Sequence, residues 1–237
     1  MKKDNLNHLI VGIGGEVGTG LLKFLCKKTN VWGIDKKEFP PYPDHIDVMH
    51  IAISYKARHF EYIVKEYKRR FKPKMVIIHS TVPVGVCDQL RAIHSPIRGV
   101  HPKLHLGIKT FLKYFGGKDS LKAAKLFQSY GCPVLSTNKA RHTEALKLWD
   151  TTQYGWQIVL MKEIYSWCKK NKVPFEFIYQ HANFTYNEGY KKLDRPEVVR
   201  PYLDYKKGKI GGHCVVQNLE MIDSFISSVI KFKNKKY

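Results

Sequence analysis

The stretch LNHLIVGIGGEVG, residues 6–18, decides how the rest of the sequence is interpreted. Its first six residues are mostly apolar and predict a short buried strand, and an apolar helix pattern begins directly after the stretch. Between strand and helix stand Gly12, Gly14 and Gly18. Glycine permits a tight turn and a close approach of the backbone to a pyrophosphate, and a helix N-terminus attracts the same group. The stretch therefore predicts a dinucleotide site, with one residue more than the common G-x-G-x-x-G spacing.

Asp35 strengthens this prediction. It follows the second predicted strand, Val31–Ile34, and lies 17 residues beyond the last glycine of the turn. An acid at this place binds the adenosine ribose hydroxyls of NAD and repels the 2′-phosphate of NADP, so we expect NAD as the cofactor. Ser54, at the end of a third predicted strand over Asp47–Ser54, is assigned to the same cofactor site. The alternative is a glycine turn that binds nothing.

Strands and helices alternate up to about residue 137. Further strands are predicted at Lys74–Ser80, Ile97–Val100 and Tyr114–Gly116, and helices at about 57–71 and 120–130. Such an alternation predicts an α/β fold with a Rossmann-type parallel sheet. We therefore expect residues 1–137 to form an NAD-binding Rossmann domain.

The pattern then changes to helix. One long helix is predicted over Arg141–Lys170, and its apolar residues run nearly all round it, which indicates burial on all sides. Because a small domain cannot easily cover such a helix, Trp149 or Trp156 is expected to pack against a second subunit. A final helix is predicted at Leu219–Phe232. Residues 138–237 are therefore predicted to form a helical domain for substrate binding and dimerisation, in a homodimer.

The composition restricts the class of protein. The net charge of +21 favours anionic partners, although the basic residues are spread along the chain and a solvated surface explains them as well. No nucleic-acid-binding motif is recognisable, so no specific nucleic-acid partner is expected. No apolar run is long enough for a membrane helix, and the five cysteines form no C-x-x-C pair. We expect a cytoplasmic protein without disulfide framework, bound metal or membrane.

Three further segments follow in order: HSTVPVG at 79–85, EALKLWDTT at 144–152 and GKIGGHC at 208–214. After a dinucleotide turn, this series resembles the nucleotide-sugar dehydrogenases, the UDP-glucose and GDP-mannose dehydrogenase family, with its S-T-V-P, E-x-x-K-x-x-x-N and G-G-x-C segments. GGHC is most similar to the branch that oxidises UDP-N-acetyl-mannosamine-type sugars. The resemblance covers nearly the whole chain. Only 23 residues follow the cysteine, so the resemblance implies that the family's C-terminal nucleotide-binding domain is lacking.

The resemblance implies roles for three residues. Cys214 matches the nucleophile that captures an aldehyde as a thiohemiacetal, which is then oxidised to a thioester and hydrolysed. Lys147 matches the lysine that holds or deprotonates the reacting oxygen. Thr81 matches the threonine that positions water or a substrate oxygen, and it is also assigned to the cofactor site. The structural alternatives are an inert cysteine in a glycine turn, a solvated helix lysine and a helix cap.

The thiols are predicted to differ in reactivity. Cys214 is expected to react fastest because its glycine neighbours expose it. Cys87 is its rival, since it begins a helix and a helix N-terminus lowers a thiol pKa. Cys26, Cys132 and Cys168 are expected to be buried, because two of them lie on apolar helix patterns and the third precedes a proline.

The sequence departs from the family pattern at three positions. Lys103 stands where the family has a glutamate that assists thioester hydrolysis, Thr151 replaces an asparagine, and Asn218, which we still assign to the catalytic site, replaces an aspartate. His101 is the substitute base that we consider, with a structural histidine as its alternative. The pair His101-Pro102 also resembles prephenate dehydrogenases. A lysine on the first long helix is shared with β-hydroxyacid dehydrogenases, and these relatives oxidise in a single step.

We therefore predict an NAD-dependent oxidoreductase that acts on an alcohol group of a small, anionic or sugar-like substrate. An anionic substrate is consistent with the basic residues Lys103, Arg200, Lys206, Lys207 and Lys209. One alternative is a single-step enzyme similar to β-hydroxyacid or prephenate dehydrogenases. The other is an NAD-binding protein with impaired catalysis, which the missing acids favour.

Overall fold

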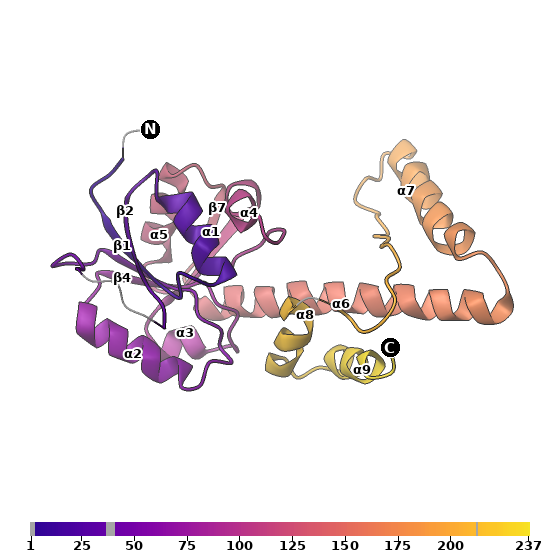
Figure 1. Cartoon of the computed structure of the whole chain (residues 1–237). Helices are drawn as coiled ribbons and strands as arrows, with labels where there is room; N and C mark the ends of the chain where they lie inside the picture. The colour runs from indigo at the N-terminus through magenta and orange to yellow at the C-terminus, as the bar shows by residue number, and fades with distance from the viewer. Residues whose placement is uncertain (1–2, 37–40, 212) are drawn as a thin grey trace. The chain divides into compact units, whose positions relative to one another are not determined.

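The computed structural model describes residues 3–36, 41–211 and 213–237 of the chain, and only the backbone at 213 and 214. The chain divides into two compact units, Met1–Lys147 and Leu148–Tyr237 (Figure 1). The first unit extends beyond the predicted border at residue 137, because the start of the long helix α6 (Ala140–Asn171) belongs to it. Ala140 is fully buried in the core of this unit.

The first unit is built on a seven-stranded sheet with the order β2-β1-β3-β4-β5-β6-β7. The strands are β1 (Asn7–Val11), β2 (Asn30–Ile34), β3 (Val48–Ile51), β4 (Met75–Ile78), β5 (Ile93–His94), β6 (Lys113–Gly116) and β7 (Val134–Thr137). All neighbouring pairs are parallel except β5 and β6, which are antiparallel. The predicted fold class, a Rossmann-type parallel sheet followed by a mainly helical part with one long helix, is confirmed.

Helices cover both faces of the sheet. The helices α1 (Glu16–Leu25), α4 (Leu104–Thr110) and α5 (Ser120–Ser129) cover one face, and α2 (Phe60–Phe71) and α3 (Val86–Gln89) cover the other. Successive strand residues point to opposite faces, so Leu9 packs in the core under α2 and Ile10 in the core under α1. Because both faces are covered, the strands read as continuous apolar runs rather than alternating ones.

The fifth strand lies earlier than predicted. The sequence pattern favoured Ile97–Val100, but the structure pairs Ile93 and His94 with Ile77 and Ile78 of β4. Pro96 follows closely, and proline has no N–H group with which to continue a ladder. The chain then leaves the sheet through Gly99, whose φ of +151° is accessible mainly to glycine. Residues 97–100 therefore form the loop that leads into α4.

The second unit is helical. Besides the larger part of α6 it contains η1 (Glu176–His181), a π-helix, then α7 (Ala182–Lys192), α8 (His213–Asn218), η2 (Leu219–Met221), a single 3-10 turn, and α9 (Phe225–Asn234). The prediction of one final helix over 219–232 is wrong at its start. Ser224 and Ser227 form a capping box, each side chain bonded to the backbone N–H of the other, and this cap begins α9 at Phe225.

The long helix is only partly covered within its own unit. Trp156 packs beside the buried cluster of Val159, Ile210 and Leu219, whereas Trp149 is 46% exposed. Uncovered aromatic surface on α6 is consistent with a second subunit, and the homodimer stays a prediction. Among the described residues, no helix combines the length and the apolar character that a membrane crossing requires.

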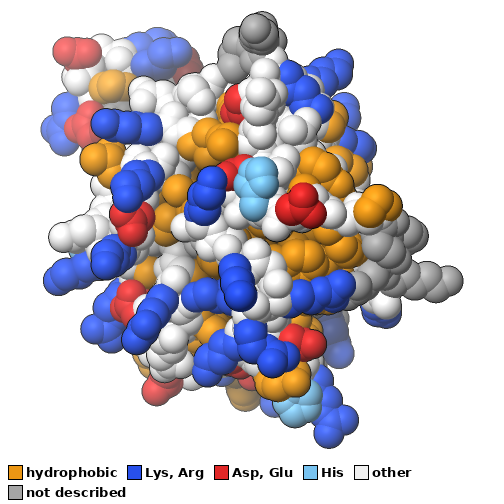
Figure 2. All heavy atoms as spheres, turned by 90° about the vertical axis from the view of Figure 1, so that its left-hand side faces the viewer, with side chains coloured by type: hydrophobic (Ala, Val, Ile, Leu, Met, Phe, Trp, Pro, Cys, Tyr) orange, Lys and Arg blue, Asp and Glu red, His pale blue; other side chains and the backbone are white. Residues whose placement is uncertain are grey.

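Basic side chains are scattered over the surface. On the face shown in Figure 2, Lys and Arg are distributed among neutral and acidic groups and form no single block. This distribution agrees with the solvated-surface interpretation of the net charge of +21.

Candidate functional site

Four of the predicted site segments meet at the carboxyl edge of the parallel strands. The glycine turn follows β1, Asp35 follows β2, Ser54 lies beyond β3, and Thr81 lies beyond β4. Since β2, β1, β3 and β4 are neighbours in the sheet, these loops are neighbours too. Ligands of open α/β sheets bind outside the carboxyl ends of the strands. The sheet order thus brings the predicted cofactor residues to one edge.

The turn after β1 requires glycine at two positions. Gly12 has a φ of +86°, and a Cβ atom there would lie 2.8 Å from the Ile53 side chain. A Cβ atom at Gly18 would lie 2.0 Å from the Gly12 carbonyl oxygen. Both positions therefore exclude side chains, because the first turn of α1 lies directly on the turn that precedes it. This is the close backbone packing that a dinucleotide turn needs.

Asp35 lies against this turn. Its Oδ2 accepts a hydrogen bond from the Gly14 N–H at 2.8 Å, and its Oδ1 accepts one from the Lys36 N–H at 2.8 Å. The acid predicted to bind the ribose hydroxyls is thus placed beside the glycines predicted to approach the pyrophosphate. The residues present fit a dinucleotide with a free 2′-hydroxyl, because a second negative charge at Asp35 is unfavourable.

Ser54 and Thr81 occupy the next two loops. Ser54 is exposed, and its Oγ accepts a hydrogen bond from the Lys56 N–H at 3.3 Å. Thr81 is half-buried and follows Ser80, whose hydroxyl donates to the Ile53 carbonyl oxygen and so joins the ends of β3 and β4. The structure therefore places both residues at the predicted edge. Their contacts with a cofactor stay predictions.

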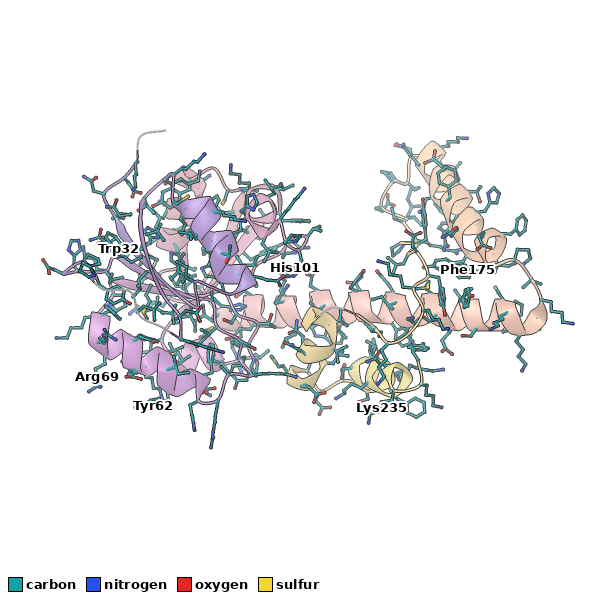
Figure 3. The ribbon with its side chains drawn as sticks, viewed as in Figure 1. Trp32, Tyr62, Arg69, His101, Phe175 and Lys235 are labelled. Carbon is teal, nitrogen blue, oxygen red and sulfur yellow. The ribbon has the colours of Figure 1, made fainter. Side chains whose placement is uncertain are left out.

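His101 lies at the glycine turn. Its Nδ1 is 2.8 Å from Oε2 of Glu16, which stands in the first turn of α1. Figure 3 labels His101 in the first unit, on the side where α1 lies. Lys103, the replacement for the family glutamate, is exposed just before α4. The imidazole of His101 is therefore engaged by a carboxylate of the turn, which is a structural reason for its position.

Lys147 is not a solvated helix lysine. Its Nζ donates to the Ile97 carbonyl oxygen at 3.0 Å, and its side chain is half-buried. Glu144, one turn earlier, accepts hydrogen bonds from the N–H groups of Gly85 and Cys87 at 2.6 and 2.8 Å. The glutamate and the lysine of EALK thus tie α6 to the loops after β4 and β5. Sequence reasoning missed the role of Glu144, whose only signal was its place in the motif.

Cys87 is not a rival nucleophile. Burial, together with the neighbouring Glu144 carboxylate, raises the pKa of its thiol, and the side chain is fully buried. The expectation that a helix N-terminus lowers this pKa is wrong, since α3 has only four residues and Glu144 already occupies its N-terminal N–H groups. Cys132 and Cys168 are buried as predicted, but Cys26 is exposed because it caps the end of α1. The Cys214 thiol lies outside the described part of the structure.

The second unit brings together two of the departures from the family pattern. Asn218 is buried, and its Nδ2 donates to Thr151 Oγ1 at 3.1 Å. Of the predicted basic residues, Arg200 places its guanidinium 3.5 Å from the centre of the Tyr186 ring, while Asn187 bonds both backbone groups of Arg200. Lys206, Lys207 and Lys209 are exposed. Their contacts with an anionic substrate stay predictions.

The burial of Lys113 near the site was not foreseen in the sequence analysis. Lys113, at the start of β6, is almost fully buried, and its Nζ donates to the Ser95 carbonyl oxygen at 3.2 Å. Burial, with a smaller contribution from Lys147, lowers the pKa of Lys113 to about 7. Nothing in the local sequence separates this lysine from an exposed one, because its burial depends on α5 and the loop after β5.

Three buried histidines form a ladder across the sheet. His8 Nδ1 lies 2.9 Å from His50 Nε2, and His50 Nδ1 lies 2.9 Å from His79 Nε2. The rings are stacked, with centroids 5.1 and 5.2 Å apart. His79 Nδ1 ends the ladder on the Ser95 carbonyl oxygen at 2.7 Å. No group of three or more His, Cys, Asp or Glu residues within the described ranges is arranged to hold a metal ion.

Comparisons with known proteins find relatives by structure. No family model matches the sequence, and no curated protein matches it. The fold is similar to a UDP-D-ManNAc dehydrogenase from Pyrococcus horikoshii, with a TM-score of 0.78 and 14% identity over 98% of this chain and 68% of that one. A UDP-glucose dehydrogenase from Pyrobaculum islandicum gives a TM-score of 0.76 and 16% identity over 99% and 69%.

A shorter class of dehydrogenase has the same fold. A 3-hydroxyisobutyrate dehydrogenase from Mycobacterium tuberculosis gives a TM-score of 0.68 and 13% identity over 98% of this chain and 94% of that one. The structural similarity to nucleotide-sugar dehydrogenases implied by the motifs is thus confirmed, and this chain spans about two thirds of their length. Identities this low show the fold alone.

Proposed function

We propose that the protein is an NAD-dependent oxidoreductase that acts on an alcohol group of a small, anionic or sugar-like substrate. The observation that carries the proposal is the hydrogen bond of 2.8 Å between the Gly14 N–H and Asp35 Oδ2. It supports NAD because it holds the ribose-binding acid against the glycines that approach the pyrophosphate. When bound, NAD supplies the acceptor for the hydride that leaves the alcohol carbon.

Lys147 is the residue that we assign to the reacting oxygen. Its attachment to the Ile97 carbonyl oxygen fixes the amine at the edge of the sheet where the cofactor residues lie. As a neutral amine it takes the hydroxyl proton while the hydride leaves the adjacent carbon, so that one proton and one hydride are accounted for. As an ammonium group it stabilises negative charge on the same oxygen. Thr81 is assigned to hold water or a second substrate oxygen.

Cys214 is the residue that we assign to the step from aldehyde to acid. Its thiolate forms a C–S bond with the carbonyl carbon, and the carbonyl oxygen takes up a proton. The hydride on that carbon would pass to a second NAD while the hydroxyl loses its proton, and water would cleave the resulting thioester into acid and thiol. Lys103 and Asn218 replace the family acids and supply no carboxylate to assist the last step. Covalent turnover would therefore give a burst of NADH, limited by the amount of enzyme, before a slow steady state.

A single oxidation is the second candidate function. It is favoured by the similarity to 3-hydroxyisobutyrate dehydrogenase, which extends over 94% of that chain. In this version Lys147 acts alone and Cys214 has no chemical role. A protein that binds NAD without turnover is the remaining alternative, favoured by the lost acids at Lys103 and Asn218.

The test combines binding and turnover. NAD and NADP are titrated by calorimetry, and NADH formation is then followed on nucleotide sugars, sugar phosphates and hydroxyacids. Lys147→Met is expected to abolish turnover, whereas Lys170→Met, on an exposed lysine of the same helix, keeps it. Cys214→Ser is expected to limit the yield to one NADH per alcohol. Failure to bind NAD contradicts the proposal. Binding of NAD without turnover of any substrate supports the alternative of an NAD-binding protein with impaired catalysis.

A further inference from the structure

Glu144, near the start of α6, is a buried carboxylate that the proposed chemistry does not use. Its side chain is fully buried in the first unit. Its Oε2 accepts a hydrogen bond from the Gly85 N–H at 2.6 Å, and its Oε1 accepts one from the Cys87 N–H at 2.8 Å. The two donors lie at the start of α3, 59 and 57 residues earlier in the chain. One carboxylate therefore binds two backbone groups of one short segment.

The charge on this side chain has a structural consequence. A buried carboxylate is unfavourable unless hydrogen bonds replace its hydration. A glutamine has almost the same shape and no charge, but its amide offers one acceptor oxygen, and its NH₂ group would face the second N–H. A buried N–H without an acceptor is costly as well. The carboxylate satisfies both N–H groups, so the charge at Glu144 fixes the backbone to which it is bound.

That backbone is the far end of residues 80–87, here called the Thr81 segment. At its near end, the Ser80 hydroxyl donates to the carbonyl oxygen of Ile53, just beyond β3. At its far end, Glu144 binds the two N–H groups at the start of α3. The segment that carries Thr81 is thus fixed on both sides of this residue, by β3 on one side and by α6 on the other.

Lys147 lies about one turn further along the same helix. Side chains three residues apart on a helix are neighbours, so Glu144 and Lys147 share one side of α6. Lys147 Nζ donates to the Ile97 carbonyl oxygen at 3.0 Å. A movement of the start of α6 relative to the sheet would displace Lys147, and it would also break the two hydrogen bonds of Glu144. Glu144 therefore joins the Thr81 segment to the part of α6 that carries Lys147.

We propose that Glu144 is a positioning residue that holds Thr81 and Lys147 in a fixed placement relative to one another. The inference rests on the proposed function, in which Lys147 acts on the reacting oxygen and Thr81 holds water or a second substrate oxygen. Such chemistry depends on placement, and a displacement of about 1 Å costs a reaction on the order of 100-fold. Glu144 is not itself an acid or base of the reaction, because backbone N–H groups occupy both of its oxygens.

The Cys87 thiol reports whether the two hydrogen bonds hold, because it is fully buried beside them. Each variant is alkylated for a limited time and the labelled cysteines are quantified by peptide mapping, with the exposed Cys26 as internal reference. Glu144→Asp keeps the charge, but its side chain is one methylene shorter and cannot reach both N–H groups. In this variant Cys87 is expected to react about tenfold faster than in the wild type, because the Thr81 segment opens locally. Buried Cys132, elsewhere in the same unit, is expected to stay protected, which shows that the variant is folded.

Lys147 supplies a second readout that needs no turnover. In trace acetylation of the wild type, half-buried Lys147 is expected to react more slowly than Lys170, which is exposed. In Glu144→Asp its rate is expected to approach that of Lys170, because the start of α6 is no longer held. The matched control is Ser120→Ala, which removes a buried hydrogen bond to the Thr137 carbonyl oxygen elsewhere in the unit. It is expected to leave the labelling rates of Cys87 and Lys147 close to those of the wild type.

Kinetics connect the placement to the reaction. Glu144→Asp is expected to lower kcat by about 100-fold while the affinity for NAD, which depends on the glycine turn and Asp35, stays unchanged. Wild-type labelling rates of Cys87 and Lys147 in Glu144→Asp overturn the positioning role, and so does an undiminished kcat in a variant whose labelling rates have changed. A wild type that turns over no alcohol overturns the proposed function instead, and the labelling rates then still decide whether Glu144 holds the two residues, so that the two failures are distinguishable.

Discussion

Acid should destabilise the first unit through its histidine ladder. Burial lowers the pKa of His8 from its usual 6.5 to about 4, and burial together with neighbouring charges lowers the pKa values of His50 and His79 well below their usual range. The unfolded chain binds protons from about pH 6.5 downward, whereas the folded unit binds none at His8 until about pH 4. The contribution of the histidines to the free energy of unfolding is therefore constant above pH 7 and falls between pH 6.5 and 4.

The magnitude follows from the pKa of His8. A pKa change from 6.5 to about 4, at roughly 1.4 kcal/mol per pH unit, corresponds to about 3 kcal/mol lost by pH 4. His50 and His79 add to the loss in the same direction. Since small domains are stable by about 5–15 kcal/mol, this is a large fraction of the total.

The hydrogen-bond order explains why His8 binds the first proton. The Ser95 carbonyl can only accept, so His79 carries its proton on Nδ1, and His50 and His8 then carry theirs on Nδ1 as well. Nε2 of His8 is left facing the Tyr130 hydroxyl at 3.3 Å. That hydroxyl donates to a carboxylate oxygen of Asp4 at 2.6 Å. Nε2 of His8 is therefore the position at which the ladder binds an additional proton.

The assay is urea unfolding by circular dichroism from pH 7.5 to 4.5, with hydrogen exchange of peptides from β1, β3 and β4 to locate the change. His8→Gln is expected to be less stable at pH 7 but to lose less stability on acidification. His59→Asn, at an exposed histidine, is the control and should retain the wild-type dependence. A free energy of unfolding that stays level from pH 7 to 4.5, or a His8→Gln curve parallel to the wild type, would refute the reasoning.

Three further predictions concern the other charged and aromatic residues. Burial lowers the pKa of Lys113 from 10.5 to about 7, so wild-type stability should rise between pH 7 and 10. In urea unfolding, Lys113→Met should be more stable than the wild type by up to about 5 kcal/mol at pH 6.5, and this difference should shrink by pH 10. Asp35→Asn should lower the affinity for NAD about tenfold in calorimetry and reduce the preference for NAD over NADP. Equal or tighter binding of NADP by the wild type would contradict the assignment of Asp35. Light scattering at micromolar concentration should show at least a dimer that Trp149→Glu weakens, and a wild-type monomer would contradict the second-subunit prediction.

The fold was largely predictable because its signals are local. The apolar run before Gly12 and the glycine turn specify a strand, a turn and a helix within 20 residues, and the later alternation extends the pattern. The fifth strand was misplaced because Ile97 looks as apolar as Ile93. The choice between them is made by pairing with β4 and by Pro96, which are not visible in a hydrophobicity pattern.

The residues of the candidate site were predictable only where they belong to a recognisable motif. Gly12, Asp35 and Lys147 were assigned to the candidate site through their spacing and family likeness, and their contacts with ligands stay predictions. Glu144 and Lys113 were not foreseen, because what distinguishes a buried charged side chain is its partner, and these partners come from distant loops. Tertiary contacts decide which polar side chains are buried in the core, so sequence periodicity cannot identify them.

Thr151 and Asn218 show that departures from a family pattern can be coupled. The Asn218 amide donates to Thr151 Oγ1, and the Thr151 hydroxyl in turn donates to the Leu148 carbonyl oxygen at 3.0 Å. Asn218→Asp alone would replace that donor by a buried carboxylate facing a hydroxyl whose proton is already used, which is costly. Pairing it with Thr151→Asn supplies amide N–H donors to the new carboxylate. The double variant is therefore expected to be more stable than Asn218→Asp in urea unfolding, and a purely additive result would show that the two positions are independent. If they are coupled, one substitution does not restore the family's hydrolytic acid in this chain, and a slow release after the NADH burst is then the signature expected of the proposed covalent chemistry.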